Sequence, residues 1–181
     1  MSPAGAIELL IIEDTLTQAM MMKHLLEGHG FVISIARSGA DALSKLETLK
    51  PEAILTDINM PEMDGYQLAR KLKESPGLAD IPVILLASFL SPQDVLKIID
   101  CKADNFILKC YDEDYFVPLL NNILKSANLR KKNGKQSSTA EVCFQGKMTE
   151  VVFEQHHAID MLLSSFETNV YLNRKGAKAD S

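Results

Sequence analysis

The sequence predicts an α/β fold in which a doubly wound, five-stranded parallel sheet is followed by a small β-hairpin and a helix. Two patterns lead to this prediction. Short and almost continuously apolar runs alternate with longer segments in which apolar residues recur every three or four positions. Strands buried on both faces of a parallel sheet show the first pattern, and helices that pack on such a sheet show the second.

The expected strands are short runs rich in Ile, Leu and Val: Ile7–Ile12, Phe31–Ala36, Ala53–Thr56, Val83–Leu86 and Phe106–Leu108. The expected helices lie after each of them: Gln18–Gly28, Ala40–Leu49, Gly65–Lys73, Pro92–Asp100 and Glu113–Leu129. In the first helix, Met21, Met22, Leu25 and Leu26 fall on one face. Repeated β-α units predict parallel pairing, and we expect the strand order 2-1-3-4-5.

Composition divides the chain into three parts. Residues 1–129 form the predicted α/β domain, residues 130–140 a polar linker, and residues 141–181 a hairpin and helix extension. The segment EVCFQGKMTEVVF has two β-prone arms around Gln-Gly-Lys, which predicts the hairpin.

A helix is expected from about Gln155 onward. Its apolar residues form one stripe: Ile159, Leu162, Leu163, Phe166 and Val170. Two uses of the stripe remain open. It packs on the hairpin or the domain, or it forms the coiled-coil seam of a homodimer.

Length and charge exclude several classes of function. A chain of 181 residues with 46% hydrophobic composition can bury a full core. Residues 1–127 carry 11 Lys and Arg against 18 Asp and Glu, so their net charge is −7, a poor match for nucleic acid. No apolar run approaches the roughly 18–20 residues of a membrane span, and no signal peptide is evident, so we expect a cytoplasmic protein without membrane contact.

The three cysteines favour neither a disulfide framework nor a zinc site. Cys101, Cys110 and Cys143 are odd in number, lack Cys-x-x-Cys spacing and have no clustered histidines. We interpret them as reduced thiols.

Charged residues follow three of the expected strands. Glu13 and Asp14 follow the first strand, Asp57 the third and Lys109 the fifth. The carboxyl ends of parallel strands meet at one edge of the sheet, so the three carboxylates are expected to converge and repel one another. Mg²⁺ suits such a cluster, and the Lys109 ammonium can pair with a phosphoryl oxygen. We expect Asp57 to be exposed on a rigid turn, as the nucleophile in a phosphate site.

Four motifs carry a resemblance to a known family: LLIIEDT, LTDINMPEMDG, IPVILLAS and ADNFILK. Over residues 7–127 the chain resembles the receiver domain of the two-component response regulators. The resemblance implies a flavodoxin-like fold and a phosphoprotein of signal transduction. The tail, above all EVCFQGK and AIDMLLSSFE, is similar to the connector that follows receivers in some multi-domain sensory proteins.

The resemblance also implies a role for each residue of the site. Asp57 is the implied phospho-acceptor, and Lys109 is the implied partner of the phosphoryl group. The implied Mg²⁺ ligands are Asp57, Asp14, Glu13 indirectly or through a water, and the main-chain carbonyl of Asn59.

Two positions depart from the family pattern. Ala87 stands where the family has the Thr or Ser that moves on phosphorylation, and Phe106 occupies the position of the aromatic switch residue that follows it. Ser88 is the remaining candidate for a phosphate contact, although alternation along a strand points it away. Cys110 stands where the family commonly has Pro after Lys109, so this peptide bond is either a strained cis bond or a relaxed trans bond.

The resemblance implies a receiver that accepts phosphate from a sensor histidine kinase or a phosphotransfer protein and signals to a downstream protein partner. It is not expected to be a turnover enzyme. A receiver fold used for interaction without phosphorylation is the alternative, because of Ala87 and Cys110. A haloacid-dehalogenase-like phosphatase is a third reading, but it requires Asp-x-Asp where this chain has Glu13-Asp14-Thr15.

Overall fold

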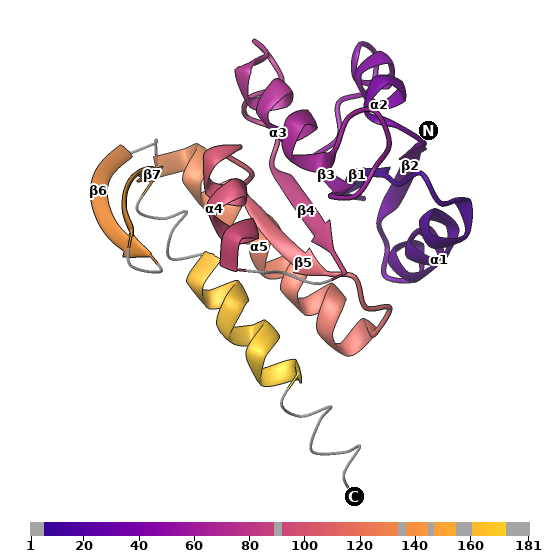
Figure 1. The fold of residues 1–181 in the computed structure, drawn as a ribbon. Coiled ribbons are helices and arrows are strands. Elements are labelled where there is room, and N and C mark those ends of the chain that lie inside the picture. Colours follow the sequence, from indigo (N-terminus) through magenta and orange to yellow (C-terminus); the bar gives the residue numbers. More distant parts are fainter. Residues whose placement is uncertain (1–5, 89–91, 134–136, 145–146, 155–160, 173–181) are drawn as a thin grey trace, which may run out of the picture.

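The computed structural model of the chain describes residues 6–88, 92–133, 137–144, 147–154 and 161–172 (Figure 1). Its centre is a five-stranded sheet with the order β2-β1-β3-β4-β5. The strands are β1 (Glu8–Ile12), β2 (Val32–Ala36), β3 (Ala53–Asp57), β4 (Val83–Ala87) and β5 (Asn105–Leu108). All neighbouring pairs in this sheet are parallel. The predicted fold class and strand order are therefore confirmed.

Helices cover both faces of the sheet. They are α1 (Leu16–Glu27), α2 (Gly39–Leu46), α3 (Gly65–Glu74), α4 (Pro92–Asp100) and α5 (Glu113–Asn133). The core has two layers because successive strand residues point to opposite faces. In β1, Leu9 and Ile11 pack with side chains of α1 and α5, whereas Leu10 and Ile12 pack with side chains of α2, α3 and α4.

Element boundaries differ from the predicted ones by a few residues. Helix α1 begins at Leu16 rather than Gln18, and α5 continues to Asn133 rather than ending at Leu129. Strand β3 extends to Asp57, which pairs in register with Leu86 of β4. Asp57 was expected just beyond the end of the strand, but it is the last residue of β3 and takes part in the pairing with β4.

After α5 the chain forms a second, antiparallel sheet of two strands, β6 (Ser137–Phe144) and β7 (Lys147–Glu154). The stretch expected as a linker, residues 130–140, includes the end of α5 and the start of β6, and its residues 134–136 lie outside the described residues. Residues 161–172 are helical, while the expected helix start at Gln155 and the stripe residue Ile159 lie outside the described part. Among the described residues, no helix combines the length and apolar character needed to span a membrane.

The turn after β3 is built around one glycine. Asp64 caps α3 in a capping box with Gln67, and the Gly65 amide donates to the Ile58 carbonyl oxygen at 2.9 Å. A Cβ atom at position 65 would lie 2.3 Å from the Asp57 carbonyl oxygen and 2.9 Å from the Ile58 Cα. Helix α3 therefore begins directly against the backbone that carries Asp57, and only glycine fits there.

Replacing Gly65 by Ala should destabilise the protein by about 1–3 kcal/mol, because the added methyl group meets main-chain atoms that cannot rotate away. Urea unfolding followed by circular dichroism measures the change. Gly28→Ala is the matched control, since Gly28 has φ −60° and the heavy atom nearest to a Cβ placed there, the Leu25 carbonyl oxygen, is 3.4 Å away. Equal unfolding midpoints for the two variants would contradict the proposed close approach.

Candidate functional site: an acidic cluster with a buried lysine

Three carboxylates converge at the carboxyl ends of two adjacent strands. Glu13 and Asp14 follow β1, and Asp57 ends β3, its neighbour in the sheet. One carboxylate oxygen from each of the three residues lies within 4.8 Å of the other two. The pairing of β1 with β3 brings these residues together although more than forty positions separate them in the chain.

Lys109 lies at the centre of this cluster. Its Nζ is 2.6 Å from Glu13 Oε2, 2.8 Å from Asp57 Oδ2 and 3.0 Å from Gln18 Oε1. These acceptors match the three hydrogens of an ammonium group. The Lys109 amide also donates to the Ala87 carbonyl oxygen at 2.7 Å. This hydrogen bond fixes the main chain of Lys109 beside the end of β4.

Gln18 is a site residue that the sequence analysis did not identify. It lies in the first turn of α1, and its contact with Lys109 joins positions that are 91 residues apart. A single Gln in an amphipathic helix carries no signal of such a role. The strand order predicts that β1 and β5 end at the same edge, but not that a side chain of α1 reaches Lys109.

The pKa of Lys109 reflects two opposing effects. Burial lowers the pKa, while the hydrogen bonds and charges of Asp57 and Glu13 raise it, and the net shift is upward. The side chain is therefore an ammonium at neutral pH. Three carboxylates and one ammonium leave the cluster with a formal net charge of −2.

Asp57 is not exposed, and the expectation from the sequence was wrong on this point. The residue is only 4% exposed. It belongs to the central strand β3, between β1 and β4, and the Lys109 ammonium binds its Oδ2. Asp57 Oδ1 is buried and has no hydrogen-bond partner among the described residues. A buried carboxylate oxygen without a partner is costly unless another group binds it.

The oxygens of the cluster fit a hard divalent cation. Both oxygens of Glu13 are engaged, since Oε2 binds Lys109 and Oε1 accepts from the Thr15 amide at 3.2 Å. Asp14 is half-buried, and its Oδ1 has a long 3.4 Å contact with the Thr15 hydroxyl. The less engaged oxygens thus belong to Asp14 and Asp57, and Mg²⁺ prefers oxygen ligands of this kind.

The other predicted site residues differ in how deeply they are buried. Asn59 is exposed, two positions beyond Asp57, and Ser88 is exposed directly after β4. Ala87, the last residue of β4, and Phe106 of β5 are buried in one apolar cluster, which also includes Met161 of the terminal helix. The structure therefore buries both proposed switch positions and leaves Ser88 at the surface.

The peptide bond between Lys109 and Cys110 is trans, because the described residues contain no cis peptide bond. The Cys110 amide donates to the Leu108 carbonyl oxygen at 2.8 Å, which makes a tight turn after the lysine. Of the two alternatives for this bond, the structure has the relaxed one.

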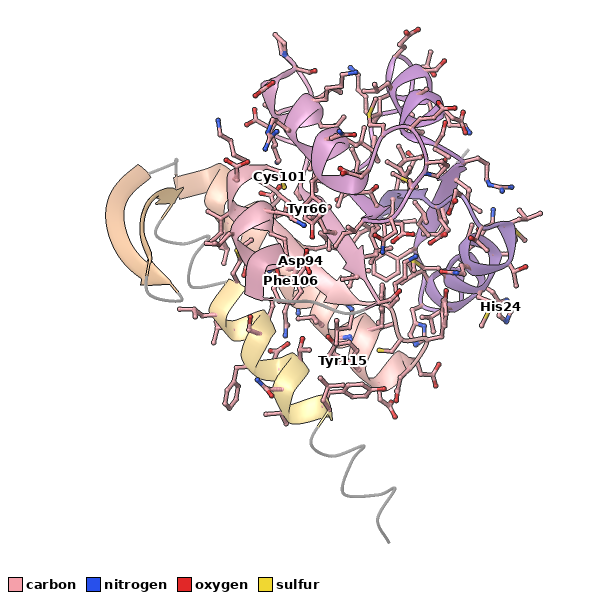
Figure 2. All side chains as sticks on the ribbon, in the orientation of Figure 1. His24, Tyr66, Asp94, Cys101, Phe106 and Tyr115 are labelled. Carbon is pink, nitrogen blue, oxygen red and sulfur yellow. The ribbon has the colours of Figure 1, made fainter. Side chains whose placement is uncertain are left out.

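A polar pocket of about 530 Å³ lies beside Asn59, between α3 and α4. Tyr66 donates its hydroxyl to Asp94 Oδ1 at 3.2 Å, and both side chains are labelled in Figure 2. Arg70 forms an ion pair with Asp100. Burial and the neighbouring Asp94 charge raise the pKa of the Tyr66 phenol. These contacts fix α4 against α3 next to the acidic cluster.

The chain matches a known family over most of this region. The model of the response regulator receiver domain matches residues 9–121. A gliding motility regulatory protein of Myxococcus xanthus is 35% identical over 106 residues, which are 59% of this chain and 14% of that protein. A probable transcriptional regulator, ycf29, of Porphyra purpurea is 30% identical over 134 residues, which are 74% of this chain and 64% of that protein.

A solved structure supports the same assignment. The receiver domain of a signal transduction histidine kinase from Syntrophus aciditrophicus is 38% identical, with a TM-score of 0.61, and the match covers 77% of this chain and all of that domain. The chain spans less than two thirds of the length of both curated relatives named above. The family match, the strand order and the acidic edge of the sheet agree, and the chain belongs to the response regulator receiver domains of two-component signalling.

Proposed function

We propose that this receiver accepts a phosphoryl group on Asp57 from a phosphohistidine, which a sensor histidine kinase or a phosphotransfer protein supplies. The observation that carries the proposal is the state of the Asp57 carboxylate. Its Oδ2 is held by Lys109, while its Oδ1 is buried without a hydrogen-bond partner among the described residues. One oxygen is thus oriented and the other remains available as the nucleophile.

The charge of the site supports a role for Mg²⁺. Three carboxylates and the Lys109 ammonium carry a formal net charge of −2, which one divalent cation balances. Asp14 and Asp57 would hold the ion directly, the Asn59 main-chain carbonyl would complete the protein ligands, and Glu13 would act indirectly. When bound, Mg²⁺ offsets the negative charge of the transferring phosphoryl group.

The chain's own residues would then orient the transfer. Asp57 attacks the phosphorus atom, a new oxygen–phosphorus bond forms, and the nitrogen–phosphorus bond of the phosphohistidine breaks. Lys109 is already at 2.8 Å from the attacking carboxylate, so its ammonium needs only a short movement to bind a phosphoryl oxygen. Glu13 and Gln18 hold the lysine on the α1 side, and Ser88 offers a hydroxyl at the rim.

The phosphoryl group stays on the chain's own side chain, so we propose a signalling role rather than turnover catalysis. A phosphorylated side chain adds about −1.5 to −2 charges at pH 7, enough to rearrange nearby donors. We propose residues 1–129 as the phospho-accepting domain and residues 141–181 as the segment that contacts a protein partner.

A second function is favoured by the switch positions. Ala87 has no hydroxyl to bind a phosphoryl group, and Phe106 is already buried beside it. A receiver in this state could bind its partner without phosphorylation. The two functions differ in a measurable way, because only the first requires a phosphoryl group on Asp57.

Incubation with a small acyl phosphate and Mg²⁺ should label the protein with one phosphoryl group, and Asp57→Asn should abolish the label because the amide is a poor nucleophile. Intact-protein mass spectrometry measures the label. Asp64→Asn is the matched control, since it makes the same change in the same turn and Asn keeps the helix cap. Failure of the wild type to take up the label would favour the second function.

Asp14→Asn should weaken Mg²⁺ binding by at least about tenfold. Loss of a residue that only supports a metal ligand already weakens metal binding by about this factor, and Asp14 is proposed to hold the ion directly. Isothermal titration calorimetry measures the affinity. Asp64→Asn serves again as control and should leave the affinity unchanged. Equal Mg²⁺ affinities for the two variants would show that Asp14 is not a ligand of the metal.

Lys109→Met should destabilise the metal-free protein by about 3–5 kcal/mol at neutral pH, because Asp57 and Glu13 lose their buried counter-charge. Because the pKa of Lys109 is raised in the folded protein, the stabilisation by its ammonium is present at neutral pH and is lost as the pH rises through that raised pKa, so the loss in the variant should become smaller at strongly alkaline pH. Urea unfolding at several pH values tests both points. The control Lys97→Met removes an exposed ion pair with Asp94 and should change the stability by less than about 1 kcal/mol. A pH-independent loss in Lys109→Met would contradict the electrostatic explanation.

A further inference from the structure

The terminal helix, residues 161–172, lies against α5 through a face that carries two hydroxyl side chains. Met161, Ser164 and Thr168 are buried on this inner face. The Thr168 hydroxyl lies 2.8 Å from the Tyr115 hydroxyl, and the Tyr115 ring stacks on Tyr171 with centroids 4.4 Å apart. Figure 2 shows Tyr115 of α5 next to this helix. Stacking and hydrogen bonds therefore hold the helix in place.

The opposite face of the same helix is apolar and exposed. We call it the outer face and define it by Leu162, Leu163 and Phe166, which are 70%, 56% and 68% exposed. All three belong to the apolar stripe of the sequence analysis. The stripe is therefore not the surface that packs on the domain.

This arrangement inverts the usual amphipathic helix. A surface helix normally buries its apolar stripe and turns polar residues to water. Here a serine and a threonine are buried while two leucines and a phenylalanine lie in solvent. Contiguous exposed apolar patches of this kind usually mark an interaction surface.

The outer face continues onto α5. Leu129 near the end of α5 is 59% exposed. A hollow of about 270 Å³ separates the two helices, and its lining includes Leu129, Leu163, Lys125 and Glu167. One surface therefore contains both an exposed aromatic side chain, Phe166, and a hollow with exposed leucines in its lining.

We propose that two copies of the chain form a two-fold symmetric dimer through the outer face and the exposed end of α5. In such a dimer each copy presents the same patch, so a projection and a hollow must occur on the same surface. Phe166 of one copy would cover the partner's Leu129 and Leu163. The inference does not depend on phosphorylation of Asp57.

A contact of the size of a stable interface requires part of α5 as well as the terminal helix. Stable complexes bury about 800 Å² on each partner. The twelve described residues of the helix span only about 18 Å and are too few to supply this area alone. The exposed leucine of α5 and the hollow extend the contact in the required direction, toward the body of the domain.

The charges that line the hollow also favour a second copy of the chain as the binding partner over a protein of strong net charge. Lys125 and Glu167 both line the hollow, with one positive and one negative side chain. A two-fold axis through the patch can bring Lys125 of each copy toward Glu167 of the other. Such pairing would make the patch complementary to itself in charge.

Sedimentation equilibrium of the full chain, from micromolar to several hundred micromolar, measures the association. We expect a monomer–dimer equilibrium, and Phe166→Glu should raise the dissociation constant by more than about tenfold, because a central aromatic residue typically dominates an interface. Leu16→Glu is the matched control: Leu16 is 55% exposed on α1, and its replacement should leave the dissociation constant unchanged. Circular dichroism spectra verify that each variant is folded.

A charge exchange tests the two-fold arrangement itself. Lys125→Glu alone and Glu167→Lys alone each place like charges opposite one another across the axis and should weaken the dimer. An equimolar mixture of the two variants should dimerise as well as the wild type, because both pairs are then of opposite sign. A wild type that stays monomeric, or a Phe166→Glu variant that dimerises normally, overturns the proposal. A mixture no better than either variant overturns the two-fold pairing.

Discussion

The site depends on one interaction, the placement of the Lys109 ammonium between two buried carboxylates. Glu13 and Asp57 end neighbouring strands, and without a counter-charge their proximity would be unfavourable in a site from which water is largely excluded. The lysine comes from β5, which lies two strands from β3, or about 10 Å across the sheet. Its side chain can span this gap because its own amide is fixed to the Ala87 carbonyl oxygen at the end of β4.

The same electrostatic balance explains why Asp57 can be buried and still be available. One of its oxygens is neutralised by the lysine, whereas the other has no partner among the described residues. Gly65 also brings α3 against the Asp57 main chain, so the backbone that carries the carboxylate is held in place. A carboxylate fixed in this way is oriented before any reactant arrives, and in the proposed transfer this would lower the entropic barrier.

The sequence was sufficient to predict the sheet and the residues of the acidic cluster, because both follow from the alternation of apolar strand segments and amphipathic helix segments along the chain. Continuous apolar runs identify parallel strands, and the strand order then determines which strand ends are adjacent. How deeply each site residue is buried could not be predicted in the same way. The burial of Asp57 depends on the ladder with β4 and on a lysine fifty-two positions later, and the contact with Gln18 depends on a single side-chain direction.

The terminal helix shows a further limit of periodicity. An apolar stripe indicates which face of a helix avoids water, but it does not identify the surface that covers it. Two tyrosines from distant parts of the chain hold this helix through its polar face, and the Tyr171 hydroxyl also donates to Asp112 at 3.1 Å. Asp112 lies only three residues after Lys109, so one short segment carries both the lysine of the acidic cluster and a contact of the terminal helix.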